Sequence, residues 1–150
     1  IKLHYIEKGE GVPLIMLHGN GESLEYFEHQ IEHFSKAYRV IAVDTRGHGK
    51  SPRGERELSL KQFADDLKKL LDDIEIKRAI LLGFSDGGNV AMLFALRYQK
   101  YVKALILNGA NLHTGGVKRK YQIPICIGYG MLAVMASFSK HAKTKKRLWH

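Results

Sequence analysis

The sequence contains almost no cysteine, and this bounds its chemistry. Of its 150 residues only Cys126 carries a thiol, so an internal disulfide is excluded. A single thiol fits a reducing compartment, and we expect a cytoplasmic protein. No activating histidine or glycine turn flanks Cys126, which favours a small buried residue over a nucleophile. The histidines are scattered and none is paired at ligand spacing, so we expect neither a metal nor another cofactor.

Acidic residues are absent from the whole stretch after Asp86. Up to that residue 15 acids stand against 13 Lys and Arg, whereas 11 Lys and Arg and no acid follow it, and the net charge is +9. The basic residues are densest at 118–120 and 143–147. No aromatic interleaving or nucleic-acid motif accompanies them, which favours a solvated basic face and no nucleic-acid partner.

One long stretch lacks charge altogether. Residues 121–139 contain no charged side chain and just reach the length of a membrane span. Pro124, two glycines and two serines interrupt it, which favours a buried or cleft-covering segment over a span, so membrane attachment is not the favoured interpretation. The sequence begins at Ile1 and not at Met, which leaves open whether a signal peptide precedes it.

Short apolar runs alternate with helical patterns along the first two thirds of the chain. Residues 1–7 predict a half-buried edge strand, and four further runs predict buried strands at 14–17, 40–43, 79–84 and 102–107. Helices are predicted after Ser23, whose apolar stripe is Phe27, Ile31 and Phe34, at 60–74 with a capping box from Ser59 to Gln62, and at 89–98. This order predicts an α/β fold with a mostly parallel sheet and flanking helices.

A serine between glycines lies at the junction of the third buried strand and the helix that follows it. The residues are Gly83 Phe84 Ser85 Asp86 Gly87. A strand that turns into a helix within one residue strains that residue and needs small neighbours at i−2 and i+2, which Gly83 and Gly87 supply. An earlier glycine loop, His18 Gly19 Asn20 Gly21, also follows a buried strand. The pattern predicts a nucleophilic hydroxyl close to backbone N–H groups, although G-x-S-x-G alone also occurs in ordinary turns.

Three motifs together resemble the α/β-hydrolase superfamily. They are residues 18–21, residues 44–51 (Asp Thr Arg Gly His Gly Lys Ser) and residues 83–89. The resemblance covers residues 1–112 as the amino-terminal part of the core, and it implies that 113–150 begin a variable cap. It further implies that Ser85 is the nucleophile and that the backbones of Asn20 and Asp86 form the oxyanion hole. In such proteins the 44–51 motif is mainly structural, so Asp44 and His48 are not assigned catalytic roles.

The resemblance implies acyl chemistry. The strand-to-helix turn that carries the nucleophile is called the nucleophile elbow in this superfamily. Its epoxide hydrolases and haloalkane dehalogenases have a carboxylate there, where this chain has Ser85. The implied activity is that of an esterase-like serine hydrolase acting on a small-molecule ester or related acyl substrate, with residues 123–138 forming part of the acyl pocket.

The sequence departs from the family in the rest of the triad. The family order is Ser, then acid, then His, but no acid follows Asp86, and His113, His141 and His150 do not match the place of the catalytic histidine. We therefore expect a fold that stops before its last strands and a 150-residue chain that is inactive by itself. The alternative is a non-catalytic binding or scaffold protein of the same fold.

Overall fold

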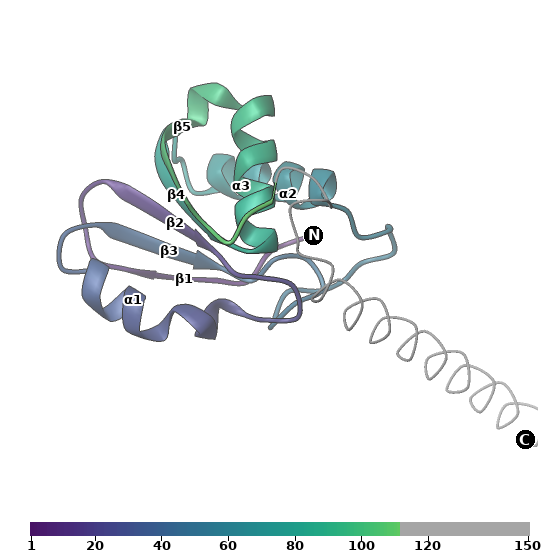
Figure 1. Ribbon diagram of the computed structural model, residues 1–150, viewed down its shortest axis with the longest axis horizontal. Helices are drawn as coiled ribbons and strands as arrows, with labels where there is room; N and C mark the ends of the chain where they lie inside the picture. The colour runs from purple at the N-terminus through teal and green to yellow at the C-terminus, as the bar shows by residue number, and fades with distance from the viewer. Residues whose placement is uncertain (112–150) are drawn as a thin grey trace, which may run out of the picture. The chain divides into compact units, whose positions relative to one another are not determined.

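The sheet is parallel except for its first strand, which runs antiparallel to its neighbour at one edge. The computed structural model describes residues 1–111 (Figure 1). Its strands are β1 (Tyr5–Lys8), β2 (Pro13–Leu17), β3 (Arg39–Val43), β4 (Ala79–Phe84) and β5 (Val102–Asn108), in the order β1-β3-β2-β4-β5. β1 runs antiparallel to β3, and the other neighbours are parallel. The predicted α/β fold with a mostly parallel sheet is confirmed.

Helices lie on both faces of this sheet. A 3-10 turn, η1 (Leu24–Phe27), leads into α1 (Glu28–Phe34) on one face, and α2 (Leu60–Asp73) and α3 (Asp86–Arg97) cover the other (Figure 1). A second 3-10 turn, η2 (Gln99–Tyr101), leads into β5. Ser59 caps α2 by accepting a hydrogen bond from the Gln62 N–H at 3.1 Å, and Ser23 caps η1 through Glu25 at 3.3 Å. Both predicted serine caps are confirmed, but the Gln62 side chain donates to Asp66 at 3.1 Å and does not complete the predicted capping box.

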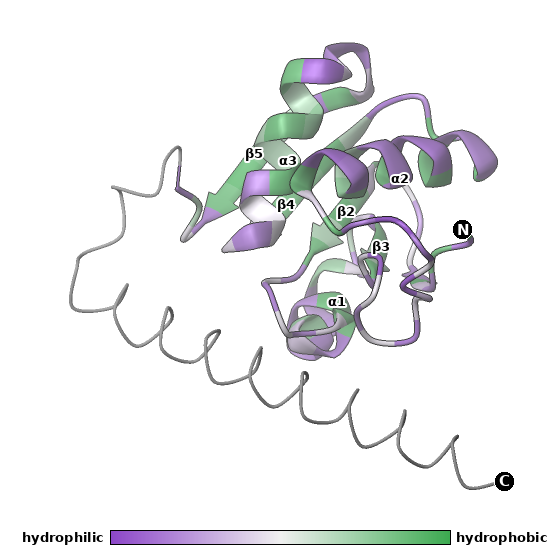
Figure 2. Ribbon diagram, turned by 90° about the vertical axis from the view of Figure 1, so that its right-hand side faces the viewer, coloured by the Kyte–Doolittle hydropathy of each residue, from purple (hydrophilic) through white to green (hydrophobic). Residues whose placement is uncertain are grey.

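Two apolar clusters hold the layers together. Alternate residues of each central strand face opposite sides, so Ile15 and Leu81 pack with α2 and α3, whereas Met16 and Val40 pack with η1 and α1. Figure 2 shows the result, with apolar residues along β2 and β4 and on α3, and apolar and polar residues alternating along α2. Each helix therefore buries one stripe against the sheet.

The prediction of a buried strand at 102–107 is wrong about burial. β5 forms, but Leu105, Ile106 and Leu107 are 37%, 49% and 42% exposed. β5 pairs only with β4 and lies at the edge of the described sheet, so one backbone edge and much of its side-chain surface are uncovered there. A continuous apolar run indicates a strand, but it does not distinguish a central strand from an edge strand.

Helix α3 also differs from its predicted bounds. It begins at Asp86, three residues earlier than predicted, because its first turn includes Gly87 and Gly88 packed against the sheet. Its apolar sequence does not make it buried all round: Phe94 faces the core, whereas Leu96 is 83% exposed.

Several predictions fall on residues outside the described range. They concern Cys126, the uncharged stretch 121–139, the three late histidines and the cap assignment of 113–150. Within residues 1–111 no helix has both the length and the hydropathy needed to cross a bilayer.

The carboxyl end of α2 stores a small strain at Glu75. Its φ is +59°, in the left-handed region, where the Ile76 N–H bonds back to the Leu71 carbonyl at 2.8 Å and closes the helix. A residue with a Cβ is disfavoured in this conformation by roughly 1–2 kcal/mol.

We predict that Glu75→Gly raises the free energy of unfolding by about 1 kcal/mol, because glycine removes that strain. Urea denaturation measures the change. Lys77→Gly is the matched control, since Lys77 is exposed and lacks a positive φ; it should cost roughly 0.5–1 kcal/mol. Equal effects of the two substitutions would contradict the prediction.

Candidate active site

The loops that carry the predicted site residues meet where the strand order reverses. From β2 the chain continues to β3 on one side, and it then returns to β4 on the other side of β2. Because β2 and β4 are parallel neighbours, the loop after Leu17 and the turn after Phe84 leave the same edge of the sheet. Open α/β sheets bind ligands at such switch points.

Ser85 occupies a strained turn between β4 and α3. Its φ and ψ are 51° and −119°, a conformation that residues with a Cβ rarely adopt. The turn is held from both sides, because the Ser85 N–H donates to the Asn108 carbonyl at 2.8 Å and the Ser85 carbonyl accepts from the Gly88 N–H at 2.9 Å. Strain of this kind persists only where surrounding contacts enforce it.

The two flanking glycines permit a close approach of helix and sheet. A Cβ placed on Gly83 would lie 2.4 Å from the Gly87 carbonyl oxygen. A Cβ on Gly87 would lie 2.0 Å from the Leu17 carbonyl oxygen, at the end of β2. These distances are far below van der Waals contact, so both positions require glycine. Gly83 does so for the predicted reason, the approach of strand and helix at this turn, whereas Gly87 is constrained by the neighbouring strand β2.

The glycine loop after β2 lies directly against Ser85. A Cβ on Gly19 would be 3.3 Å from the Ser85 Cβ and 2.9 Å from Oε2 of Glu22. The Gly19 N–H donates to that Glu22 oxygen at 2.9 Å. The carboxylate therefore helps to fix the loop beside the serine.

The structure brings the three predicted site residues to the same part of the sheet edge. Asn20 is exposed and follows Gly19, whose Cα faces Ser85, and Asp86 follows Ser85 as the first residue of α3. The N–H groups of a helix's first turn have no intrahelical carbonyl to bind, which makes them anion donors. Their use as an oxyanion hole remains a prediction.

His18 is buried and held in one tautomer. It is 2% exposed, and its Nε2 accepts the backbone N–H of Thr45 at 3.1 Å. The proton therefore resides on Nδ1, which donates to the Gly19 carbonyl at 2.7 Å. Burial lowers the pKa of His18 below its ordinary value of 6.5, against the opposing bond to Gly19. Since both ring nitrogens are engaged, His18 is poorly placed to act as a base for Ser85.

The 44–51 loop contains a second buried polar network. The Asp44 carboxylate is 1% exposed and accepts hydrogen bonds from the backbone N–H groups of Leu24 and Lys50 and from Nδ1 of His4, at 2.8 to 2.9 Å. Burial opposes ionisation, but these bonds outweigh it and lower the pKa of Asp44. With its oxygens committed to three separate segments, Asp44 has the structural role that the sequence implied.

His48 lies beside the glycine loop that follows β2. Its Nδ1 is 3.1 Å from the Arg46 carbonyl oxygen, its Nε2 is 3.4 Å from Oδ1 of Asn20, and its ring centroid is 5.3 Å from that of His18. These contacts make it a neighbour of the predicted donor loop, and nothing in them assigns it a proton-transfer step.

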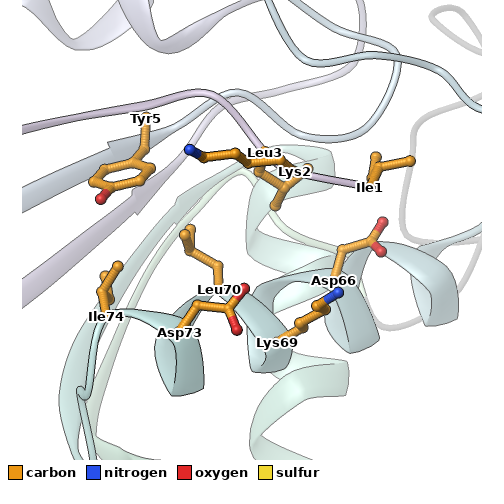
Figure 3. A pocket seen from close by; sticks show the side chains of 9 residues that line it. All are labelled: Ile1, Lys2, Leu3, Tyr5, Asp66, Lys69, Leu70, Asp73 and Ile74. Atoms are coloured by element: carbon orange, nitrogen blue, oxygen red, sulfur yellow. The ribbon is translucent and has the colours of Figure 1, made fainter.

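A cavity at another part of the fold contains none of the predicted site residues. It has a volume of about 270 Å³ and lies between the N-terminal segment and α2, with Leu3, Tyr5, Lys69, Leu70 and Asp73 among its lining residues (Figure 3). Asp66 at its margin is committed to a bidentate pair with Arg46, at 2.6 and 2.7 Å.

No triad is assembled within residues 1–111. The side chain of Asp86 accepts from Nδ2 of Asn89 at 3.3 Å and thus turns along its own helix. No group of three or more His, Cys, Asp or Glu in the described part of the chain could hold a metal ion.

Sequence reasoning missed the individual roles of His18, Glu22 and Thr45. His18 was identified only as a member of the glycine motif. Its place directly after a buried strand was the signal that could have indicated a buried histidine with a structural role. Glu22 and Thr45 gave none, because their bonds to the loop depend on which strands are neighbours.

Comparison with known proteins agrees with this geometry. Residues 12–125 match the family described as alpha/beta hydrolase fold. The chain is 35% identical over 111 residues to epoxide hydrolase 4 of Mus musculus, covering 71% of this chain and 31% of that protein. A crystal structure of a meta-cleavage product hydrolase matches with 37% identity and a TM-score of 0.70, over 72% of this chain and 41% of that one. A thermophilic esterase from Thermogutta terrifontis matches with 31% identity and a TM-score of 0.71, over 73% and 40%.

The chain therefore belongs to the α/β-hydrolase family. It spans 31% to 43% of the length of the first curated relatives that it matches. The fold expected from the three motifs is confirmed, and the relatives named above are an epoxide hydrolase, a meta-cleavage product hydrolase and an esterase.

We predict that Gly87→Ala lowers the free energy of unfolding by about 2 kcal/mol or more, because the new methyl would overlap the Leu17 carbonyl. An ordinary Gly→Ala change in a helix gains about 1 kcal/mol, so the sign itself is diagnostic. Thermal and urea unfolding measure it. The control is Gly21→Ala, where φ is +75° but nothing lies within 4 Å, and about 1 kcal/mol of strain is expected. A stabilised Gly87→Ala protein would contradict the close approach.

A second prediction concerns pH. Below 6.5 the unfolded chain protonates His18 while the folded chain holds it neutral, so the unfolded state binds more protons. The free energy of unfolding should therefore fall as the pH drops from about 7.5 to about 5.5. His18→Asn, which has no titrating ring, should show a smaller fall, measured by urea denaturation at both pH values. An identical fall in the two proteins would exclude His18 as a source of the pH dependence.

Proposed function

We propose that this chain carries the nucleophile and the oxyanion donors of a serine hydrolase that acts on a carboxylic ester or a related acyl substrate. The observation that supports it most is Ser85, held at φ 51° at a strand-to-helix turn with the start of α3 behind it. Strain at one serine is costly, and fold stability alone gives no reason to keep it.

The proposed reaction uses three groups of the described chain. The Ser85 hydroxyl attacks the acyl carbon while its proton passes to a base, and the carbonyl oxygen becomes an oxyanion. The N–H groups of Asn20 and Asp86 stabilise that charge, and a helix N-terminus adds a favourable dipole. An acyl-serine forms, the alcohol leaves with a proton, and water later releases the acid.

The choice of acyl over epoxide chemistry rests on the nucleophile. A carboxylate can open an epoxide and leave an ester that water then hydrolyses. Here the turn carries the Ser85 hydroxyl, and the neighbouring acid, Asp86, is bonded along its own helix. Because the chain is similar both to an esterase and to an epoxide hydrolase, the choice is based on the nucleophile and not on these relatives. A small-molecule acyl substrate and a cytoplasmic location are parts of the same proposal.

The test uses p-nitrophenyl esters of graded acyl length and the protein expressed from the complete coding sequence that contains this chain. Ser85→Ala should lower kcat by about 10³-fold or more, because no acyl-serine can form. Ser59→Ala, which removes only a helix cap, is the matched serine control and should retain full activity. Equal turnover by wild-type and Ser85→Ala proteins would refute the proposal and favour a non-catalytic binding protein.

The 150-residue chain alone should behave differently. Since no acid follows Asp86 in its sequence, we predict that its ester hydrolysis does not exceed that of its own Ser85→Ala variant. Rapid Ser85-dependent turnover by this chain would show that a base within it has been overlooked.

A further inference from the structure

We propose that His18 is a positioning residue that fixes the direction of the Gly19–Asn20 peptide and so aims the Asn20 N–H at the oxyanion. This inference rests on the proposed function of Ser85. It adds a buried side chain that touches neither substrate nor nucleophile but governs one of the two predicted donors.

One peptide unit joins the Gly19 carbonyl to the Asn20 N–H. The carbonyl of Gly19 and the N–H of Asn20 belong to the same trans peptide, so they point in opposite directions. Whatever holds the carbonyl also sets the N–H. The carbonyl accepts two bonds, from Nδ1 of His18 at 2.7 Å and from the Glu22 N–H at 3.3 Å.

The two bonds to the Gly19 carbonyl differ in strength. The bond from His18 is the shorter, and it is buried, where a hydrogen bond is stronger than in water. The bond from Glu22 closes a tight local turn and lies near the outer limit of hydrogen-bond length. The imidazole is therefore the main constraint on the direction of this peptide.

The imidazole of His18 is itself fixed. Its Nε2 accepts the N–H of Thr45, which follows directly on the buried Asp44 at the end of β3. Asp44 is held by bonds from three segments, so the ring is anchored to a part of the fold that cannot shift independently. The segment that follows β3 therefore holds the Asn20 N–H in place through Thr45 and His18.

Only the tautomer of His18 with its proton on Nδ1 can make both hydrogen bonds. Protonation of Nε2 would put two donors face to face, the ring N–H and the Thr45 N–H. The charged and titratable groups that face the ring are Asp44, Glu22 and His48. The Glu22 carboxylate is already committed to the Gly19 N–H, and Asp44 to its three donors. Neither is therefore available to stabilise an imidazolium by a direct bond.

Two amide substitutions separate the two ends of the ring. In His18→Asn the side-chain amide reaches the place of Nδ1, and it can still donate to the Gly19 carbonyl. In His18→Gln the amide reaches the place of Nε2, and it can accept from Thr45 but leaves the Gly19 carbonyl without its side-chain donor. Ser59→Ala is the control for general destabilisation, because it removes the cap of α2 and touches neither the glycine loop nor Thr45.

The experiment measures kcat, KM and thermal stability of these variants in the protein from the complete coding sequence. His18→Gln should lower kcat about 10- to 100-fold with KM changed less than about twofold, because the oxyanion exists only in the transition state. His18→Asn should stay within about fivefold of wild-type kcat. Ser59→Ala should lose thermal stability at unchanged kcat.

Contrary results are distinguishable. If Ser85→Ala abolishes turnover while His18→Gln retains wild-type kcat, or if His18→Gln and His18→Asn lose kcat equally, the positioning role is refuted and the nucleophile stands. If Ser85→Ala retains full turnover, the proposed function itself fails. Nitrogen-15 NMR of the His18 ring in the Ser85→Ala protein gives a readout that does not depend on activity: a proton on Nδ1 supports the proposal, and a proton on Nε2 overturns it.

Discussion

The close packing of α3 on the end of β2 is the contact on which the arrangement of this site depends. Gly87 lies so near the Leu17 carbonyl that no side chain fits between them. Because the helix begins there, the backbone N–H of Asp86 lies at the same sheet edge as the glycine loop that follows β2. Ser85 is then left no relaxed conformation between strand and helix, and its strain follows from that packing.

The buried polar groups around the site serve to hold loops. Asp44 connects the N-terminal segment, η1 and the 44–51 loop, and His18 connects β3 with the glycine loop. Arg46 and Asp66 form a further buried pair that joins the 44–51 loop to α2. Burying such a polar group costs desolvation free energy, which is offset only when every hydrogen-bonding atom of the group has a partner. Within residues 1–111 every buried side-chain nitrogen and oxygen has one. The loops that carry the predicted donors are therefore preorganised before any ligand arrives.

Most of the fold was predictable because its signals are local. Short apolar runs marked the strands, Ser59 marked the start of α2, and Gly83 and Gly87 marked the turn at Ser85. Burial was less predictable, since β5 has the sequence of a core strand but lies at the edge of the described sheet. Whether a strand has one neighbour or two depends on residues far away in the chain, so the apolar run by itself cannot predict it.

The sequence by itself determined the family and the position of the strained serine, because its motifs are contiguous and the close approach of Gly83 to the Gly87 carbonyl lies within five residues. The second close approach, of Gly87 to the Leu17 carbonyl, depends on the packing of α3 on β2. Only the tertiary structure decided how the site is held. The tautomer of His18, the partner of Glu22 and the structural commitment of Asp44 each join segments that are up to 40 residues apart. Such bonds depend on which strands become neighbours, and that is settled only when β2 pairs with both β3 and β4.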